Sequence, residues 1–159
     1  MRAPIPFLWF EKEAEEAANF YVSLLPNSRV DRVSALPVET PSGPPGSVKV
    51  VEFTLNGQAW QAMQAGPLDP FNHAVSFMIE CETQDEIDRL WDAILKNGGK
   101  ESQCGWISDR WGLKWQICPD NIKNLTRSDN VEGAKRASLA MMKMVKLDKA
   151  ALEKAFNGG

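Results

Sequence analysis

The sequence predicts an α+β fold that consists of two tandem β-α-β-β-β repeats followed by a C-terminal helical tail. Residues 57–61 and 112–116 share the pattern G-x-x-W-Q, and each copy belongs to a stretch typical of a hairpin with a tight turn. A strand and a helix with an apolar stripe precede each hairpin. These shared features indicate a duplication.

The first repeat, residues 1–66, is expected to hold one helix and four strands. Acidic residues open the helix pattern, Pro26 ends it, and Asn56-Gly57 is the strongest hairpin signal in the chain. The elements in chain order are a strand, a helix, a weaker strand, a proline-rich loop and a hairpin, over residues 5–10, 14–25, 30–36, 37–47 and 50–64.

The second repeat, residues 70–120, repeats this order. Thr83 and Glu86 form a capping-box pattern at the start of its helix, and Asp109 to Gly112 has the composition of a tight turn. After this turn the residues alternate, so that one face meets a helix or core and the other is free for a ligand. The two faces carry Leu113, Trp115 and Ile117, and Lys114, Gln116 and Cys118, respectively.

Beyond Pro119 the pattern becomes helical, and we expect a tail over residues 125–157. One helix starts near Asp129 and carries its apolar stripe at positions 131, 134, 138, 141, 142 and 145; Leu147 and Asp148 resemble a staple and cap for a shorter last helix. The length of 159 residues suits a single domain, 1–159, in which the two small repeats share a sheet or an interface.

The composition is that of an ordinary cytoplasmic protein. A net charge of −3 without a basic stretch argues against nucleic acid as a partner, and no apolar run is long enough for a membrane span. Three cysteines without C-x-x-C spacing predict neither a disulfide framework nor a zinc site.

Several motifs resemble the glyoxalase/bleomycin-resistance superfamily, also called vicinal oxygen chelate proteins. The segments L-W-F, S-F-M-I-E-C-E-T-Q-D-E-I-D-R-L-W and C-G-W-I-S-D-R-W-G-L-K-W-Q-I-C-P are similar to its PhnB-like branch, whose label is 3-demethylubiquinone-9 3-methyltransferase. The tail also resembles this branch. The resemblance implies that each repeat curls a mixed sheet into half a cup and that the protein is a homodimer with cups for a small-molecule ligand.

Metal-using members of the superfamily carry ligands on the first and last strands of each repeat, and here those positions hold weak donors. They fall near Pro6, on Gln61 and Gln116, and on Ala74 or its neighbour His73. Strand alternation favours Ala74 unless the strand start is irregular. Neutral amide oxygens bind transition metals poorly, so we expect no metal, with His73 as the one weak candidate.

The remaining candidates point to a ligand cup without naming a catalytic residue. We expect Gln61 and Gln116 to bind a ligand or to be merely solvated, and the cup wall to include Phe10, Met63, Met78 and Trp106. Trp60 and Trp115 fit a core, and Cys104 fits burial better than nucleophilic chemistry. No G-x-G-x-x-G turn follows a strand, so no S-adenosylmethionine or other cofactor is predicted.

Three functions fit these observations. The first is a small-molecule-binding protein without a metal. The second is an enzyme acting on a small ligand in the same cup, either as a metal-dependent lyase or dioxygenase or as the methyltransferase of the family label. The third is a dimeric interaction protein that uses its methionine-rich tail as the contact surface.

Overall fold

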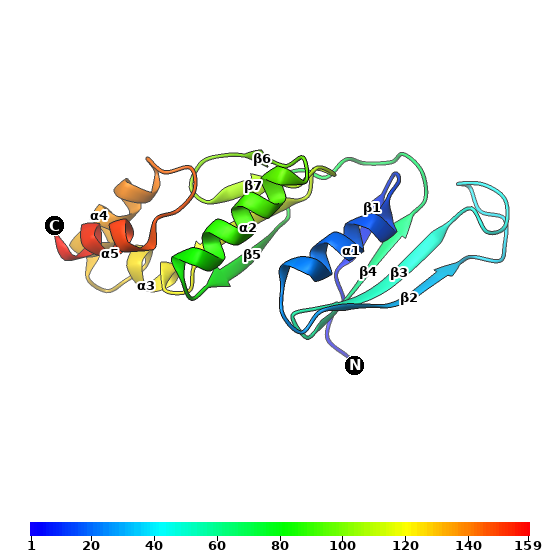
Figure 1. Cartoon of the computed structure of the whole chain (residues 1–159), viewed down its shortest axis with the longest axis horizontal. Helices are drawn as coiled ribbons and strands as arrows, with labels where there is room; N and C mark the ends of the chain where they lie inside the picture. The colour runs from blue at the N-terminus through cyan, green and yellow to red at the C-terminus, as the bar shows by residue number, and fades with distance from the viewer. The chain divides into compact units, whose positions relative to one another are not determined.

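The computed structural model describes residues 1–159, which divide into two compact units, Met1–Pro70 (unit 1) and Phe71–Gly159 (unit 2). Both units have the predicted order β-α-β-β-β (Figure 1). Each unit has its own four-stranded sheet, so of the two expected alternatives a shared sheet is excluded, and a shared interface stays a prediction. Whether they act as one domain stays a prediction. No helix is both long and apolar enough to cross a membrane.

Unit 1 packs one helix against one face of a mixed sheet. Its strand order is β1-β4-β3-β2, with β1 parallel to β4 and the other neighbours antiparallel. Tyr21 of the helix meets Phe53, which meets Trp60, with ring centroids 6.5 and 6.0 Å apart. The elements are β1 (Phe7–Phe10), α1 (Ala14–Leu24), β2 (Arg29–Ala35), β3 (Lys49–Leu55) and β4 (Gln58–Gln64).

Unit 2 repeats this topology with the strand order β5-β8-β7-β6, and β5 is parallel to β8. The helix α2 covers one face of the sheet (Figure 1), where Trp91, Trp115 and Ile117 are fully buried. Thus β4 and β8 are equivalent last strands, as the repeated pattern predicts. The elements are β5 (Ser76–Cys81), α2 (Gln84–Lys96), β6 (Lys100–Glu101), β7 (Trp106–Ser108) and β8 (Lys114–Pro119).

The local signals of unit 2 form as predicted. Thr83 and Glu86 make a complete capping box at the start of α2. Asp109 is buried in the β7–β8 turn, where its carboxylate accepts hydrogen bonds from the backbone N–H groups of Trp111 and Leu113 and from the indole of Trp115, each at 3.0 Å. Gly112 takes the positive φ of 90° that this turn requires.

The tail forms three helices, α3 (Ile122–Thr126), α4 (Val131–Met141) and α5 (Lys149–Asn157). Leu147 is buried and Asp148 caps α5, as predicted, whereas α3 was not expected. The predicted stripe on α4 is wrong in part, because Val131 and Met142 are exposed. The helix instead buries its small residues against α5; these are Gly133, Ala134 and Ala137.

Candidate functional site

Each sheet has one face that no helix of the repeat covers, and we call it the open face of that unit. Its side chains alternate with the buried ones along every strand, as a half-buried sheet requires. The open face of unit 1 carries Val50, Glu52, Gln61 and Met63 on its two central strands, and Phe7 and Trp9 on the edge strand β1. The open face of unit 2 carries Ser76, Met78, Lys100, Trp106, Ser108, Lys114 and Gln116.

Three of the predicted site residues form one row across the open face of unit 2. Gln116 on β8 lies between Met78 on β5 and Trp106 on β7. The amide Nε2 of Gln116 donates a hydrogen bond to Ser76 Oγ at 2.9 Å, which fixes the orientation of the amide. An aromatic ring, a thioether and an oriented amide therefore lie side by side, a combination suited to a small organic ligand.

His73 lies beside this row. The segment before β5 forms a turn, so the strand begins only at Ser76 and the alternation that favoured Ala74 does not extend to it. The imidazole is 6.0 Å from the ring of Trp106, centroid to centroid. The structure thus brings His73, exposed to solvent, to the aromatic part of the open face.

The tail occupies the far end of the open face of unit 2. Cys118, two residues beyond Gln116, is only 3% exposed and packs in a cluster with Leu147 and Leu152. The backbone N–H groups of Cys104 and Gly105, just before Trp106, donate hydrogen bonds to the carbonyls of residues 144 and 145 at 2.8 Å. The expectation that Cys118 is free to face a ligand is therefore wrong.

Two of the three cysteines, Cys81 and Cys118, are not activated for chemistry in this environment. Burial raises the pKa of Cys118 to about 11 and that of Cys81 to about 12, and nearby carboxylates act in the same direction. Both thiols therefore stay protonated at neutral pH, and they behave as small apolar core residues.

The other predicted residues lie elsewhere. Gln61 and Met63 are on the open face of unit 1, equivalent to Gln116 and Cys118 in unit 2. Phe10 has the opposite parity and is only 2% exposed on the face that α1 covers, so it does not line an open face. The strand starts two residues later than its apolar run suggests, at Phe7 after Pro6, and Phe10 is buried in the core.

Sequence reasoning missed the polar row next to Gln116. Lys114 lies between Ser76 and Ser108 in the sheet and donates a hydrogen bond to Ser108 Oγ at 2.8 Å. The alternation did place Lys114 on the same face as Gln116. Only the strand register, however, shows which side chains of the neighbouring strands lie beside it.

The donor set does not fit a divalent transition metal. In unit 2 the amide of Gln116 donates through its N–H₂ group to Ser76 and could offer a metal only its neutral carbonyl oxygen, and His73 is the only imidazole in the chain. No group of three or more His, Cys, Asp or Glu side chains is arranged to hold a metal ion. A single imidazole with neutral amides is a poor ligand set for such metals.

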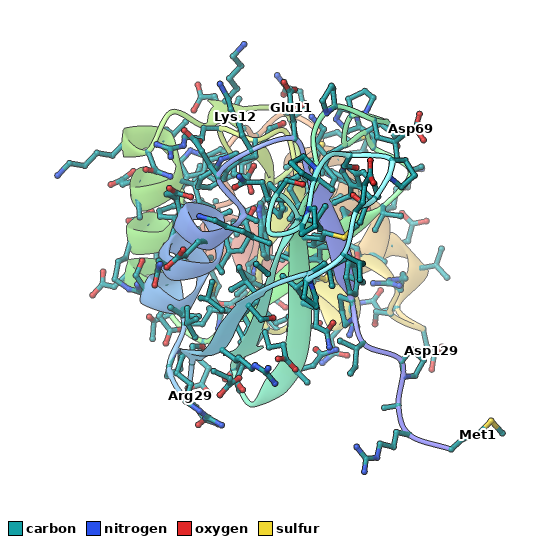
Figure 2. The ribbon with its side chains drawn as sticks, turned by 90° about the vertical axis from the view of Figure 1, so that its right-hand side faces the viewer. Met1, Glu11, Lys12, Arg29, Asp69 and Asp129 are labelled. Atoms are coloured by element: carbon teal, nitrogen blue, oxygen red, sulfur yellow. The ribbon has the colours of Figure 1, made fainter.

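The strand-to-helix turns do not fit a nucleoside cofactor such as S-adenosylmethionine either. The turn from β1 to α1 contains Glu11 and Lys12 (Figure 2), and the turn from β5 to α2 contains Glu82 and Thr83. Neither has the glycines that let a backbone approach a cofactor closely. Gly98 and Gly99 follow the end of α2 instead.

The topology and the two open faces define a protein of the glyoxalase/bleomycin-resistance fold. Solved structures share this fold at low identity. FosX, a fosfomycin resistance protein from Listeria monocytogenes, is 13% identical with a TM-score of 0.54, over 74% of this chain and 90% of that one. A glyoxylase/bleomycin resistance protein/dioxygenase domain from Frankia is 10% identical with a TM-score of 0.51, over 75% and 97% of the two chains.

The chain belongs to the family described as 3-demethylubiquinone-9 3-methyltransferase, whose model matches residues 2–118. It is also similar to the PhnB protein from Bacillus cereus, with 32% identity over 74% of this chain and 99% of that one, and a TM-score of 0.63. A comparison with curated proteins finds no match. The helices α3 to α5 lie beyond the residues that the family model matches.

Proposed function

We propose that the protein binds a small organic molecule on the open face of unit 2, without a metal. The observation that carries this proposal is the row formed by Met78, Gln116 and Trp106, with His73 beside it. Trp106 offers a flat ring for stacking, Met78 an adaptable apolar contact, and Gln116 an amide already oriented by Ser76. Met78 is 40% exposed, so this apolar surface is accessible within unit 2.

The family label alone does not support methyl transfer by this chain, because the strand-to-helix turns do not suit the cofactor. Likewise, FosX has been solved with Mn(II) and sulfate, but this chain shares only 14% identity with that structure, which supports the fold alone. Because the candidate ligands of this chain are a single imidazole and neutral amides, the metal in the FosX structure is not expected here. A sequestering or sensing protein accords best with these residues.

A thermal-shift screen tests the proposal. The panel should contain divalent metals, S-adenosylmethionine, quinones and planar aromatic compounds, since a ligand specific for the folded state raises the melting temperature by mass action. We expect organic hits whose shift is lost in Trp106→Ala and kept in Leu139→Ala, a change at an exposed site on α4. The proposal would be contradicted if a metal raised the melting temperature, or if the organic compounds shifted the melting temperature of Trp106→Ala as much as that of the wild type.

We also propose that the protein is a homodimer, the assembly that the resemblance implies. Support comes from the open face of unit 1, where the edge strand β1 presents Phe7, which is 52% exposed. Surface of this kind is commonly buried by two-fold pairing. Sedimentation equilibrium at micromolar concentration should give twice the monomer mass of 17.7 kDa, whereas the monomer mass would refute this.

A further inference from the structure

Lysine and serine alternate in a single row across all four strands of unit 2. Lys100 on β6 lies opposite Ser108 on β7, Ser108 opposite Lys114 on β8, and Lys114 opposite Ser76 on β5. In the antiparallel pairs of this row, which are Lys100 with Ser108 and Ser108 with Lys114, the Cβ atoms lie about 4.5–5.5 Å apart on the same face of the sheet. We call these four residues the Lys–Ser row.

The positive charge of this row is not compensated. Lys114 donates one hydrogen bond, to Ser108 Oγ, and neither Lys114 nor Lys100 forms an ion pair. Glu80, the acidic residue further along the same face, is paired with Lys123 at 2.7 Å. The face therefore presents two ammonium groups, while the charge of its acidic residue is neutralised.

The hydroxyl groups of the row are arranged as donors. Ser108 Oγ accepts a hydrogen bond from Lys114, and Ser76 Oγ accepts one from Gln116. Each hydroxyl keeps its own hydrogen for a further acceptor, and the Lys114 ammonium keeps two N–H donors. A group that accepts several hydrogen bonds and carries negative charge, such as a carboxylate or phosphate, matches these donors.

The row of Met78, Gln116 and Trp106 is two residues further along the strands, which corresponds to roughly 7 Å. This is about the distance from an oxyanion to the far side of one aromatic ring attached to it. Gln116 uses its N–H₂ group toward Ser76, so its carbonyl oxygen is oriented to accept a hydrogen bond from the ligand.

We propose that unit 2 binds small amphiphilic anions, with a carboxylate, phosphate or phosphonate on the Lys–Ser row and an aromatic or apolar group against Trp106 and Met78. This inference rests on the proposed function and adds the chemical class of its ligand. Lys114 is the main anchor because it lies at the centre of the row, between both serines.

Isothermal titration of the intact protein with three probes tests the ligand class. Benzoate and phenyl phosphate carry the anion, and benzyl alcohol supplies the ring without charge. We expect both anions to bind at least about tenfold more tightly than the alcohol, because hydrogen bonds to charged groups are the stronger ones. Tighter binding of phenyl phosphate than of benzoate would identify a phosphate site, and the reverse order a carboxylate site.

Variants identify the anchor. Lys114→Gln should weaken anion binding by about tenfold or more and leave benzyl alcohol within about twofold, whereas Lys114→Arg should retain much of the affinity. Arg29→Gln is the matched control. Arg29, labelled in Figure 2, occupies the equivalent row of unit 1, but it is paired with Asp31 at 2.7 Å. Arg29→Gln should leave the affinities for all three probes unchanged. An unchanged melting temperature of each variant without ligand shows that it folds.

Two results would overturn the inference. If the anions bind no better than benzyl alcohol, or if Lys114→Gln leaves anion binding unchanged, the Lys–Ser row is not the anchor. The proposed function survives either result when benzyl alcohol still binds in a way that depends on Trp106. If none of the three probes binds, the ligand class is wrong, and the screen described above decides separately whether the face binds any small molecule.

Discussion

The two units share a topology and a buried core, but their open faces differ in charge. In unit 2 the row before Gln116 holds Lys114 between two serines, whereas the equivalent row of unit 1 holds Ala59 beside Thr54. Arg29, the cation of the row in unit 1, is paired with Asp31, and Thr54 donates a hydrogen bond to the same carboxylate at 2.7 Å. One unit thus satisfies its charge internally, while the other leaves it for a partner.

The comparison also concerns what covers the sheets. The Trp of each G-x-x-W-Q pattern is buried under the helix of its unit, so the duplication kept the residues that pack the core. On the open faces Met63 in unit 1 corresponds to Cys118 in unit 2, and Cys118 is enclosed by the tail helices of its own unit. Packing constrains the covered faces and leaves the open faces free to diverge, and the proposed ligand site lies on one of the open faces.

The turns before the two last strands should differ most in their contribution to stability. Asp109→Ala removes the acceptor of three hydrogen bonds in a buried turn, and we expect a loss of about 3 kcal/mol or more in the free energy of unfolding. Asn56→Ala in unit 1 changes a residue with φ of 47° and should cost about 1 kcal/mol.

Urea unfolding measures both changes. Asp109→Asn should fall between the wild type and the alanine variant, because an amide retains one acceptor oxygen. Equal losses for Asp109→Ala and Asn56→Ala would show that the turn of unit 2 is not held by this carboxylate.

A second pair of variants tests the contact between the tail helices and the repeat within unit 2. A Cβ on Gly105 would lie 2.9 Å from the Ile117 carbonyl oxygen and from Leu147, so Gly105→Ala combines a steric clash with the strain of its positive φ. We expect a loss of about 2–3 kcal/mol. Gly66→Ala in unit 1 has a similar φ of 79° but nothing within 4 Å, and should cost only the strain, about 1 kcal/mol.

Hydrogen exchange at the Cys104 amide, which binds the Met144 carbonyl, shows whether the loss in Gly105→Ala comes from release of the tail. Faster exchange there, and not in unit 1, is the expected result. If the two glycine variants lose equal stability, Leu147 of the tail does not pack closely against Gly105.

Removal of the helix N-cap interactions should produce a smaller difference in stability between the two units. Thr83→Ala removes the capping box of α2 and should cost about 1 kcal/mol, while Thr83→Ser keeps the hydroxyl and should cost much less. The N-cap residue of helix α1, Glu13, makes no side-chain cap bond, so no cap substitution in unit 1 should cause an equivalent loss of stability. Thermal unfolding of the two variants checks this, and equal destabilisation by serine and alanine would contradict it.

The smallest expected effect on stability comes from the ion pairs between the tail and the repeat of unit 2. Hydrogen bonding to Lys146 lowers the pKa of Asp88 from its ordinary 3.8, and hydrogen bonding to Lys149 lowers that of Asp120. The same bonds raise the pKa of both lysines above 10.5. A carboxyl with a lowered pKa loses its contribution as the pH falls below about 3.8, and a lysine with a raised pKa loses its contribution above about 10.5.

The stability of the contact between the tail and the repeat of unit 2 should therefore be constant across the neutral pH range and decrease at both low and high pH. The effect is small because these pairs are exposed and screened by salt. Tail mobility, followed by NMR relaxation of α5 as a function of pH, is the measurement. A transition between pH 5 and 9 would mean that another group controls the contact.

The repeats and their order could be predicted from the sequence because alternation, the capping box and the hairpin turns are local signals. Helix α3 could not, since it is one short turn without an apolar period of its own, buried by tertiary contacts at Ile122 and Leu125. Phe10 was assigned to the wrong face because its strand starts at Phe7 and a short apolar run does not reveal its parity.

The candidate site could be predicted only in part. Gln116, Met78 and Trp106 were found one by one, but the register that joins them depends on pairing between distant strands, which a single sequence does not encode locally. The Lys–Ser row was missed for the same reason, because Lys100 and Ser76 lie far from Lys114 in the chain and meet it only through the sheet.

Mapping of phenyl phosphate binding by two-dimensional NMR tests the difference between the open faces most directly. Backbone amide shifts of the whole chain would be followed during a titration at low salt, where charge interactions are least screened. We expect saturable changes at Ser76, Trp106, Ser108 and Lys114, and none in the equivalent row of unit 1 around Arg29, Thr54 and Ala59. Equal changes in both rows, or changes confined to unit 1, would contradict the account.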